Sequence, residues 1–141
     1  MFQVKKQGGL LLILILLAVV MVFIVASVVR SSERGYQLLS MADGVKLMNE
    51  EPESLLVDVR TVEEYESGHI PGAVLLPIAE IREGNVAEML PDPEQCILLY
   101  CRTGRRAEDS AALLAGMGYT RLYSIGGIVD WPGEVVIGMN P

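Results

Sequence analysis

Hydrophobic positions follow two different patterns along the chain. Residues 10–29 form one apolar run without a charged side chain, in which Ser27 is the single polar residue. After this run, short apolar segments alternate with stretches in which apolar residues recur at helical spacing. The first pattern is typical of a membrane-spanning helix, and the second is typical of a globular α/β domain.

The apolar run is long enough to cross a bilayer. Its twenty residues would rise about 30 Å as an α-helix, which matches the hydrocarbon thickness of a membrane. A cleaved signal peptide has an apolar region of only about 7–15 residues, and Val25-Ala26-Ser27 is a poor cleavage site. We therefore expect a tail (residues 1–9), an uncleaved transmembrane anchor (10–29) and a linker (30–35). A cleaved signal is the main alternative, and a buried core helix is a weaker one.

The charges that flank the apolar run bear on its orientation. Lys5 and Lys6 precede the run, and Arg30 and Arg34 follow it, so basic residues are equal in number on the two sides. The free amino terminus adds a positive charge to the short tail. We therefore expect the N-terminus inside the cell and the folded domain on the periplasmic or extracytoplasmic side.

The rest of the sequence, residues 36–141, predicts alternating strands and helices. We expect strands at 55–59, 73–76, 97–100 and 122–125, and helices at 41–49, 62–66, 78–89 and 105–117. In the last helix, Ala111, Leu114 and Met117 share one face, and Gly118 is a C-terminal stop. The alternation predicts an α/β fold with a central parallel sheet flanked by helices, in which ligands bind beyond the carboxyl ends of the strands.

Charge limits the class of partner. From Tyr36 to the C-terminus the chain has seven basic and seventeen acidic residues, a net charge of −10, which disfavours nucleic acid as a partner. Three of the basic residues, Arg102, Arg105 and Arg106, lie within five positions of one another. This positive island on an acidic domain indicates an anionic ligand.

The cysteines of the chain are expected to differ in reactivity. Cys96 and Cys101 lie five positions apart, so on one strand they point to opposite faces and a disulfide between them is not expected. Cys101 lies where a predicted strand ends, just before a tight loop and a helix. Gly104 permits the unusual dihedrals that such a loop needs, and the loop and the helix start then point several backbone N–H groups inward. Such surroundings lower a thiol pKa from about 8.5 by roughly one to several units. We therefore expect Cys101 to be nucleophilic rather than a small buried hydrophobe, which is the role expected for Cys96.

Three separated segments of the sequence resemble the rhodanese family of sulfurtransferases. They are LLVDVRTVEEYESGHIPGAVLLP, CRTGRR and SIGGIVDW, which occur in the family's order between about Tyr36 and Val136. The resemblance implies a rhodanese-like domain in which Cys101 takes the outer sulfur of thiosulfate or another sulfane donor. It then holds this sulfur as a persulfide and passes it to a thiol or a cyanide-like acceptor. No cofactor and no metal are expected.

The resemblance also implies roles for the loop that follows the nucleophile. The backbone N–H groups of Arg102, Thr103, Gly104, Arg105 and Arg106 would surround the sulfur, and the Arg102 or Arg105 side chain would hold the donor's anionic group. The implied partners are a small anionic sulfur donor and a thiol acceptor or partner protein.

Loop length and one substitution bear on the reaction. Phosphatase-like members of the family have an active loop that is one residue longer, whereas the loop from Cys101 to Arg106 has the shorter, sulfur-sized form. A phosphatase or arsenate reductase is therefore disfavoured, and the negative charge of the domain would repel phosphorylated partners. Ala107 stands where many sulfurtransferases carry serine or threonine, which leaves donor preference and rate open.

Two other groups of residues invite a functional interpretation. Asp58 and Arg60 follow a strand near the loop, where a carboxylate could orient Arg106, although a purely structural ion pair is favoured. His69 lies in the turn GHIPGA and is expected to be structural rather than a partner of the nucleophilic cysteine.

The remaining candidates are expected to be structural or solvated. Glu63, Glu64 and Glu66 are assigned to the solvated face of a short helix, without metal-ligand spacing. Trp131 is expected to pack the closing turn of the domain.

Two classes of function follow from these assignments. The favoured one is a sulfurtransferase, and the alternative is a non-catalytic binding or redox-sensing module, because a fold alone does not fix function. A reactive thiol on the exported side would face an oxidising compartment. We therefore expect the thiol of Cys101 to be recessed and to depend on an external reductant.

Overall fold

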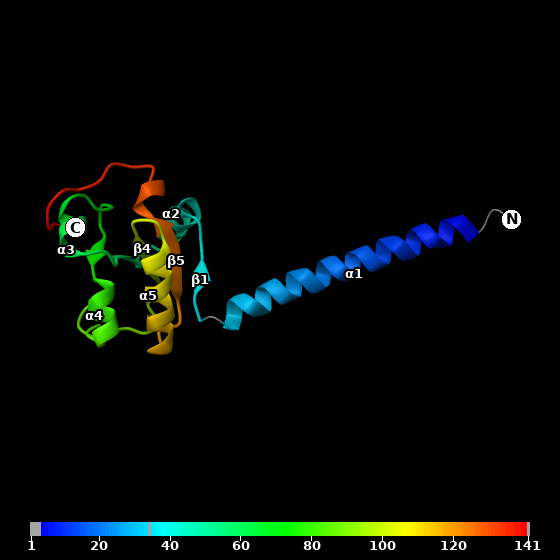
Figure 1. Cartoon of the computed structure of the whole chain (residues 1–141), viewed down its shortest axis with the longest axis horizontal. Coiled ribbons are helices and arrows are strands. Elements are labelled where there is room, and N and C mark those ends of the chain that lie inside the picture. Colours follow the sequence, from blue (N-terminus) through cyan, green and yellow to red (C-terminus); the bar gives the residue numbers. More distant parts are fainter. Residues whose placement is uncertain (1–3, 34, 141) are drawn as a thin grey trace. The chain divides into compact units, whose positions relative to one another are not determined.

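The N-terminal unit of the chain is a single helix. The computed structural model describes the backbone of residues 4–33 and 35–140, and side chains from residues 9–26 and 35–140. It divides the chain into two compact units, Met1–Glu33 and Arg34–Pro141, and the first contains α1 (Val4–Glu33) (Figure 1). Helix α1 continues through residues 30–33, so this part of the predicted linker is helical. Residues 1–3 of the predicted tail lie outside the described part.

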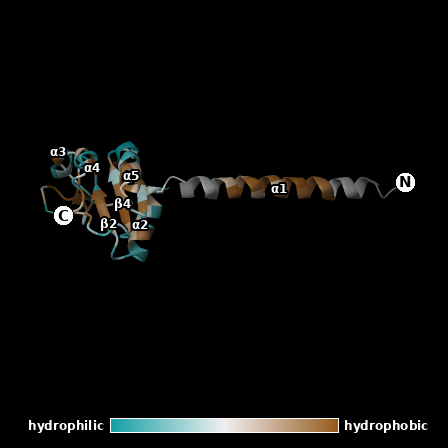
Figure 2. Cartoon of the chain, turned by 90° about the horizontal axis from the view of Figure 1, so that it is seen from below, coloured by the Kyte–Doolittle hydropathy of each residue, from teal (hydrophilic) through white to brown (hydrophobic). Residues whose placement is uncertain are grey.

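Helix α1 carries the long apolar run of the sequence. Its segment Gly9–Ala26 is hydrophobic throughout and has none of its residues buried within the protein (Figure 2). By length and composition it is the one helix among the described residues that could cross a membrane. The alternative that this segment is a buried core helix is therefore wrong. A signal sequence and a membrane anchor both have the length and composition observed here.

The second unit is built on a five-stranded parallel sheet. Its strand order is β1-β5-β4-β2-β3, and each neighbouring pair is parallel. The strands are β1 (Gln37–Leu38), β2 (Leu55–Asp58), β3 (Val74–Leu75), β4 (Ile97–Cys101) and β5 (Leu122–Gly127). Every residue of the central strand β4 is buried, as expected for a parallel strand that helices cover on both faces. The predicted α/β class is confirmed.

Helices cover both faces of the sheet (Figure 1). They are α2 (Met41–Glu50), α3 (Val62–Glu66), α4 (Ile78–Glu83) and α5 (Arg105–Gly116), and a 3₁₀ turn, η1 (Ile128–Asp130), follows β5. Residues of α4 and α5 pack into one hydrophobic cluster with one face of the sheet, and residues of α2 and α3 pack into a second cluster. Cys101 belongs to the first cluster and Cys96 to the second, so the predicted opposite orientation of the two thiols is confirmed.

Three predicted details of these elements are wrong. Helix α4 ends at Glu83 instead of residue 89, because Gly84 adopts a left-handed conformation (φ +80°) that terminates the helix. Strand β1 is absent from the predicted set, because two exposed edge residues leave no recognisable pattern. Met117 lies just beyond the end of α5 and is 41% exposed, so it does not share the buried face of Ala111 and Leu114.

Candidate active site

Cys101 lies at the carboxyl end of β4, where the chain turns into α5. The intervening loop has only three residues, 102–104, and the last of these, Gly104, precedes the first turn of α5 in a left-handed conformation (φ +106°). The Gly104 N–H donates a hydrogen bond of 3.1 Å to Cys101 Sγ. The sulfur therefore lies where the N-terminus of α5 concentrates backbone N–H groups, which favours negative charge on it.

The thiol of Cys101 is recessed, as the sequence predicts. Only 1% of the residue is exposed, and it packs in the same hydrophobic cluster as Ala107 and Val59. Solvent therefore reaches very little of this residue. The methyl group of Ala107 is fully buried. One turn later the hydroxyl of Ser110 is also buried, and none of the described residues forms a hydrogen bond with it.

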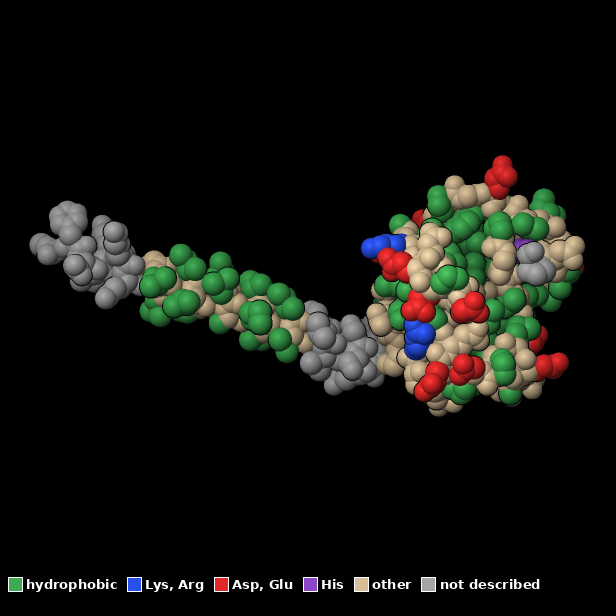
Figure 3. Space-filling model, turned by 180° about the vertical axis from the view of Figure 1, so that it is seen from behind, with side chains coloured by type: hydrophobic (Ala, Val, Ile, Leu, Met, Phe, Trp, Pro, Cys, Tyr) green, Lys and Arg blue, Asp and Glu red, His purple; other side chains and the backbone are tan. Residues whose placement is uncertain are grey.

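The three arginines that follow Cys101 have two different environments. The side chains of Arg102 and Arg105 are exposed, and within the described residues no hydrogen bond or ion pair engages them. Asp and Glu side chains are spread over the face of the domain displayed in Figure 3. Arg102 and Arg105, which follow Cys101 closely in the chain, therefore add positive charge to an otherwise acidic surface.

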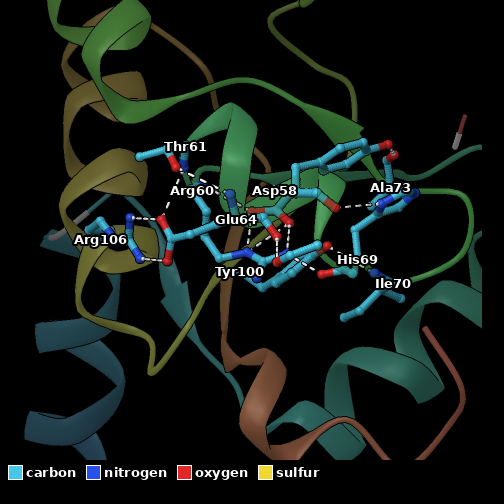
Figure 4. Close-up of polar contacts among 12 residues, drawn as sticks. Asp58, Arg60, Thr61, Glu64, His69, Ile70, Ala73, Tyr100 and Arg106 are labelled. Carbon is cyan, nitrogen blue, oxygen red and sulfur yellow. Dashed lines mark hydrogen bonds and ion pairs between the residues drawn. The ribbon is translucent and has the colours of Figure 1, made fainter. Parts of the chain in front are cut away.

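Arg106 is held by Glu64 of α3. Its Nη1 and Nη2 atoms donate to Glu64 Oε2 and Oε1 over 2.6 and 2.7 Å, a bidentate contact that links the first turns of α5 and α3 (Figure 4). The hydrogen bonds from Arg106 lower the pKa of Glu64 to about 2, and Glu64 in turn raises the pKa of Arg106. The expectation that Glu64 belongs to the solvated face is therefore wrong.

Glu64 also caps its own helix. The Thr61 N–H donates to Glu64 Oε2 over 3.1 Å, and the Glu64 N–H donates to Thr61 Oγ1 over 3.3 Å, which together form a capping box. The spacing of Thr61 and Glu64 in the sequence contains the signal for this cap. The partner on α5 lies 42 positions further along the chain, and nothing local in the sequence identifies it.

Asp58 and Arg60 form a buried ion pair that does not contact Arg106. Arg60 Nη2 donates to Asp58 Oδ2 over 2.6 Å and to the Gly68 carbonyl over 2.8 Å. The guanidinium carbon of Arg60 also lies 5.8 Å from the ring centre of Tyr100. Burial lowers the pKa of Arg60, but the hydrogen bond and charge of Asp58 outweigh it and raise the pKa overall. The pair ties β2 to the segment before β3, so its favoured structural interpretation agrees with the geometry.

His69 binds backbone groups rather than the nucleophile. Its Nδ1 lies 3.0 Å from the Tyr65 carbonyl oxygen, its Nε2 lies 2.9 Å from the Asn140 carbonyl oxygen, and its ring stacks on that of Tyr65. The backbone of His69 also forms a bridge with Val136. The imidazole therefore fastens the C-terminal segment to the turn before β3, which is a structural role.

Two further predictions concern packing. Cys96 is buried in the second cluster, where burial raises the pKa of its thiol, and both cysteines are free. Trp131 packs against the same cluster while its Nε1 donates to the Glu134 carbonyl over 3.0 Å. The inert role of Cys96 and the packing role of Trp131 agree with these surroundings.

Comparison with known proteins identifies the family. The family model of the Rhodanese-like domain matches residues 41–134, which include the cysteine loop and the strands on either side of it. The chain belongs to the rhodanese-like family. The family resemblance inferred from the three sequence segments is thereby confirmed.

The relatives of this rhodanese-like chain differ in their activities. It is 35% identical over 74 residues to the thiosulfate sulfurtransferase PspE of Escherichia coli (strain K12), covering 52% of this chain and 70% of that protein. It is 37% identical over 94 residues to the tRNA uridine(34) hydroxylase of Photorhabdus laumondii, covering 64% of this chain but only 27% of that protein. The family therefore includes a sulfurtransferase and a protein with another named activity.

Solved structures agree with this assignment. The chain matches a structure described as a rhodanese with anions from E. coli, with a TM-score of 0.54 and 34% sequence identity. The match covers 60% of this chain and 99% of that one. The parallel sheet and its helices therefore form a rhodanese-like domain.

Proposed function

We propose that this chain is a rhodanese-type sulfurtransferase that moves sulfane sulfur from thiosulfate or a persulfide donor to a thiol or a cyanide-like acceptor. The observation that carries the proposal is the position of Cys101 Sγ, recessed at the end of β4 and hydrogen-bonded by the Gly104 N–H at the start of α5. This arrangement supports a thiolate and can hold the charge of a bound persulfide. The likeness to the thiosulfate sulfurtransferase PspE supports the same reaction class.

The reaction would proceed in two steps through Cys101. In the first, the thiolate attacks the outer sulfur of thiosulfate, a sulfur–sulfur bond forms, and sulfite leaves with the electron pair of the broken bond. In the second, a thiolate or cyanide attacks the outer sulfur of the persulfide, and the Cys101 thiolate leaves. The N–H groups of the loop from Arg102 to Arg106 would stabilise the charge on the outer sulfur between the two steps.

Arg106 would have a different role in binding from Arg102 and Arg105. Because the Arg106 side chain forms an ion pair with Glu64, the exposed Arg102 and Arg105 would hold the anionic end of the donor. Arg106 would instead contribute its backbone N–H, and its guanidinium, whose pKa is raised mainly by Glu64 and further by Cys101, would help to hold charge on the sulfur. The presence of anions in the related E. coli rhodanese structure supports an anionic ligand.

The proposal includes attachment to a membrane through α1. The exposed apolar surface of Gly9–Ala26 supports burial in lipid. The basic side chains that flank it are balanced, and the positive charge of the amino terminus supports a periplasmic or extracytoplasmic position for the catalytic domain. The recessed thiol suits an oxidising compartment, because a covered sulfur is less accessible to oxidants.

Steady-state formation of thiocyanate from thiosulfate and cyanide tests the function. We expect turnover by the full chain in detergent and none by the Cys101→Ser variant, because serine cannot form a persulfide. The matched control is Cys96→Ser, which removes the other thiol of the chain and should keep turnover. Absence of turnover with thiosulfate and with persulfide donors would favour the binding or redox-sensing module instead.

A further inference from the structure

Backbone atoms of β5 lie directly against the active-site loop. Gly127 pairs with Cys101 across the β4–β5 ladder. A Cβ atom added at Gly127 would lie 2.5 Å from Thr103 Cα and closer still to the Arg102 carbonyl oxygen. Packed atoms do not approach one another this closely. Any side chain at position 127 would therefore displace the loop.

Two more contacts join the same segments. A Cβ atom at Gly104, which already has a positive φ of +106°, would lie 3.2 Å from Gly126 Cα. The Val129 N–H, in the 3₁₀ turn after β5, donates to the Arg102 carbonyl oxygen over 3.4 Å. The segments 102–104 and 126–129 therefore interlock backbone to backbone.

This interlocking determines the direction of one peptide group. The Arg102 carbonyl faces β5, where Gly127 leaves room for it and Val129 supplies a donor. No cis peptide bond occurs among the described residues. In a trans peptide the C=O and the next N–H point in opposite directions. The Thr103 N–H therefore points away from β5.

We propose that Gly127 and the Val129 N–H are positioning groups for sulfur transfer, which hold the Arg102–Thr103 peptide so that the Thr103 N–H joins the Gly104 N–H at the sulfur carried by Cys101. This inference rests on the proposed function and extends it to residues outside the cysteine loop. A donor that is fixed before the reaction stabilises developing charge without reorganisation. The pair of glycines on β5 thus contributes to the shape of the sulfur site.

The test is the Gly127→Ala variant of the full chain in detergent. A methyl group there pushes the Arg102–Thr103 peptide away from β5, so single-turnover loading of sulfur from thiosulfate should fall about 100-fold, the usual effect of losing one such donor. The pH profile of Cys101 alkylation by iodoacetamide should also change, because the displaced loop no longer directs the same N–H groups at the sulfur. A Gly127→Ala protein with the loading rate and alkylation profile of the natural chain would overturn the inference.

Gly44→Ala is the matched control. A Cβ atom at Gly44 would lie 2.7 Å from Ile125 Cγ2, so it presses on the same strand β5 without touching the loop. It should lower stability but leave the alkylation profile and the loading rate per folded molecule unchanged. If Gly44→Ala shifted the profile as much as Gly127→Ala does, the effect would be general to the strand, and the inference would be wrong.

Measurements on the natural sequence cover the case in which Gly127→Ala does not fold. In NMR spectra of the full chain in micelles, ionisation of Cys101 should move the amide resonances of Thr103 and Gly104, and the Val129 amide should exchange slowly with solvent. An unmoved Thr103 amide, or a Val129 amide that exchanges as in an open chain, would contradict the proposal. Since ionisation and alkylation do not require a sulfur donor, these results stand apart from a failure of the natural chain to load sulfur.

Discussion

At the scale of single residues, the contact between Glu64 and Arg106 could not be predicted from the sequence. Consecutive carboxylates on a short helix are usually solvated, and Glu63 and Glu66 are exposed as expected. Glu64 differs because the fold brings α5 beside α3, so one carboxylate both caps its helix and fixes the last arginine of the loop. The capping spacing is visible in the sequence, but the ion pair depends on tertiary structure.

The Glu64 contact predicts a pH-dependent contribution to stability. The folded-state pKa of Glu64, about 2, lies below the ordinary value of 4.5, so the contribution is present above about pH 4.5 and is lost as the pH falls toward 2. Glu64→Gln should lower the free energy of unfolding by about 1 kcal/mol at pH 7, because the pair is about one-third exposed and partly screened. Urea unfolding of the full chain at pH 7 and pH 3 measures the difference, which should be smaller at pH 3.

Glu66→Gln is the control for this prediction. It removes the same charge from the same helix, but the Glu66 side chain is exposed, so its effect at either pH should be near zero. Equal effects of the two substitutions, or a Glu64 effect that grows as the pH falls, would contradict the assigned ion pair.

At the scale of elements, most of the fold followed from the hydrophobic pattern. Ile97–Cys101 is an apolar run that ends in the proposed nucleophile, and the sheet buries all five of its residues. Helix α4 was predicted too long because the apolar spacing continues to Met89, whereas Gly84 in a left-handed conformation ends the helix after Glu83. The close approach of Gly127 to the loop was also beyond prediction, because it joins segments that are distant in sequence.

The buried pair of Asp58 and Arg60 joins β2 to the turn before β3 and should be essential for stability. Asp58→Asn leaves the Arg60 guanidinium buried without its counter-charge, so unfolding should become easier by about 3–5 kcal/mol. Thermal and urea unfolding of the full chain measure this cost. Sulfur loading per folded molecule should stay unchanged, because the pair does not contact Arg106.

An exposed pair on α2 provides the comparison for Asp58→Asn. Lys46 and Glu50 lie 3.8 Å apart on the surface, so Lys46→Gln should change the free energy of unfolding by less than about 0.5 kcal/mol. If Asp58→Asn cost no more than Lys46→Gln, or if it lowered loading in the folded protein, the purely structural role of the buried pair would be wrong.

At the scale of the whole molecule, the apolar helix and the acidic domain predict how the protein distributes in a cell. Expressed in a Gram-negative bacterium, the full chain should remain with membranes after an alkaline carbonate wash and keep its complete mass, because the exposed apolar surface of Gly9–Ala26 needs lipid. A reporter fused to the C-terminus should be active only outside the cytoplasm. A shortened soluble product would indicate a cleaved signal, and a cytoplasmic reporter signal would reverse the proposed orientation.

The charge distribution of the domain explains why an anionic sulfur donor would bind only at the loop that follows Cys101. The domain is acidic from Tyr36 to its end, whereas Arg102 and Arg105 follow Cys101 closely in the chain and form no ion pair with the residues that the structure describes. An anionic donor would therefore be attracted to the loop and repelled from much of the remaining surface. The contrast between the acidic domain and the basic residues near Cys101 can be predicted from the sequence. The ion pair that distinguishes Arg106 from Arg102 and Arg105 is seen only in the structure.

The intact mass of the full chain before and after exposure to thiosulfate shows whether Cys101 carries sulfur. We predict a gain of one sulfur atom that is absent from Cys101→Ser, is retained by Cys96→Ser and is lost on adding cyanide or a thiol. A chain that gains no sulfur from thiosulfate or from persulfide donors, or that gains it equally without Cys101, would contradict sulfur transfer through Cys101.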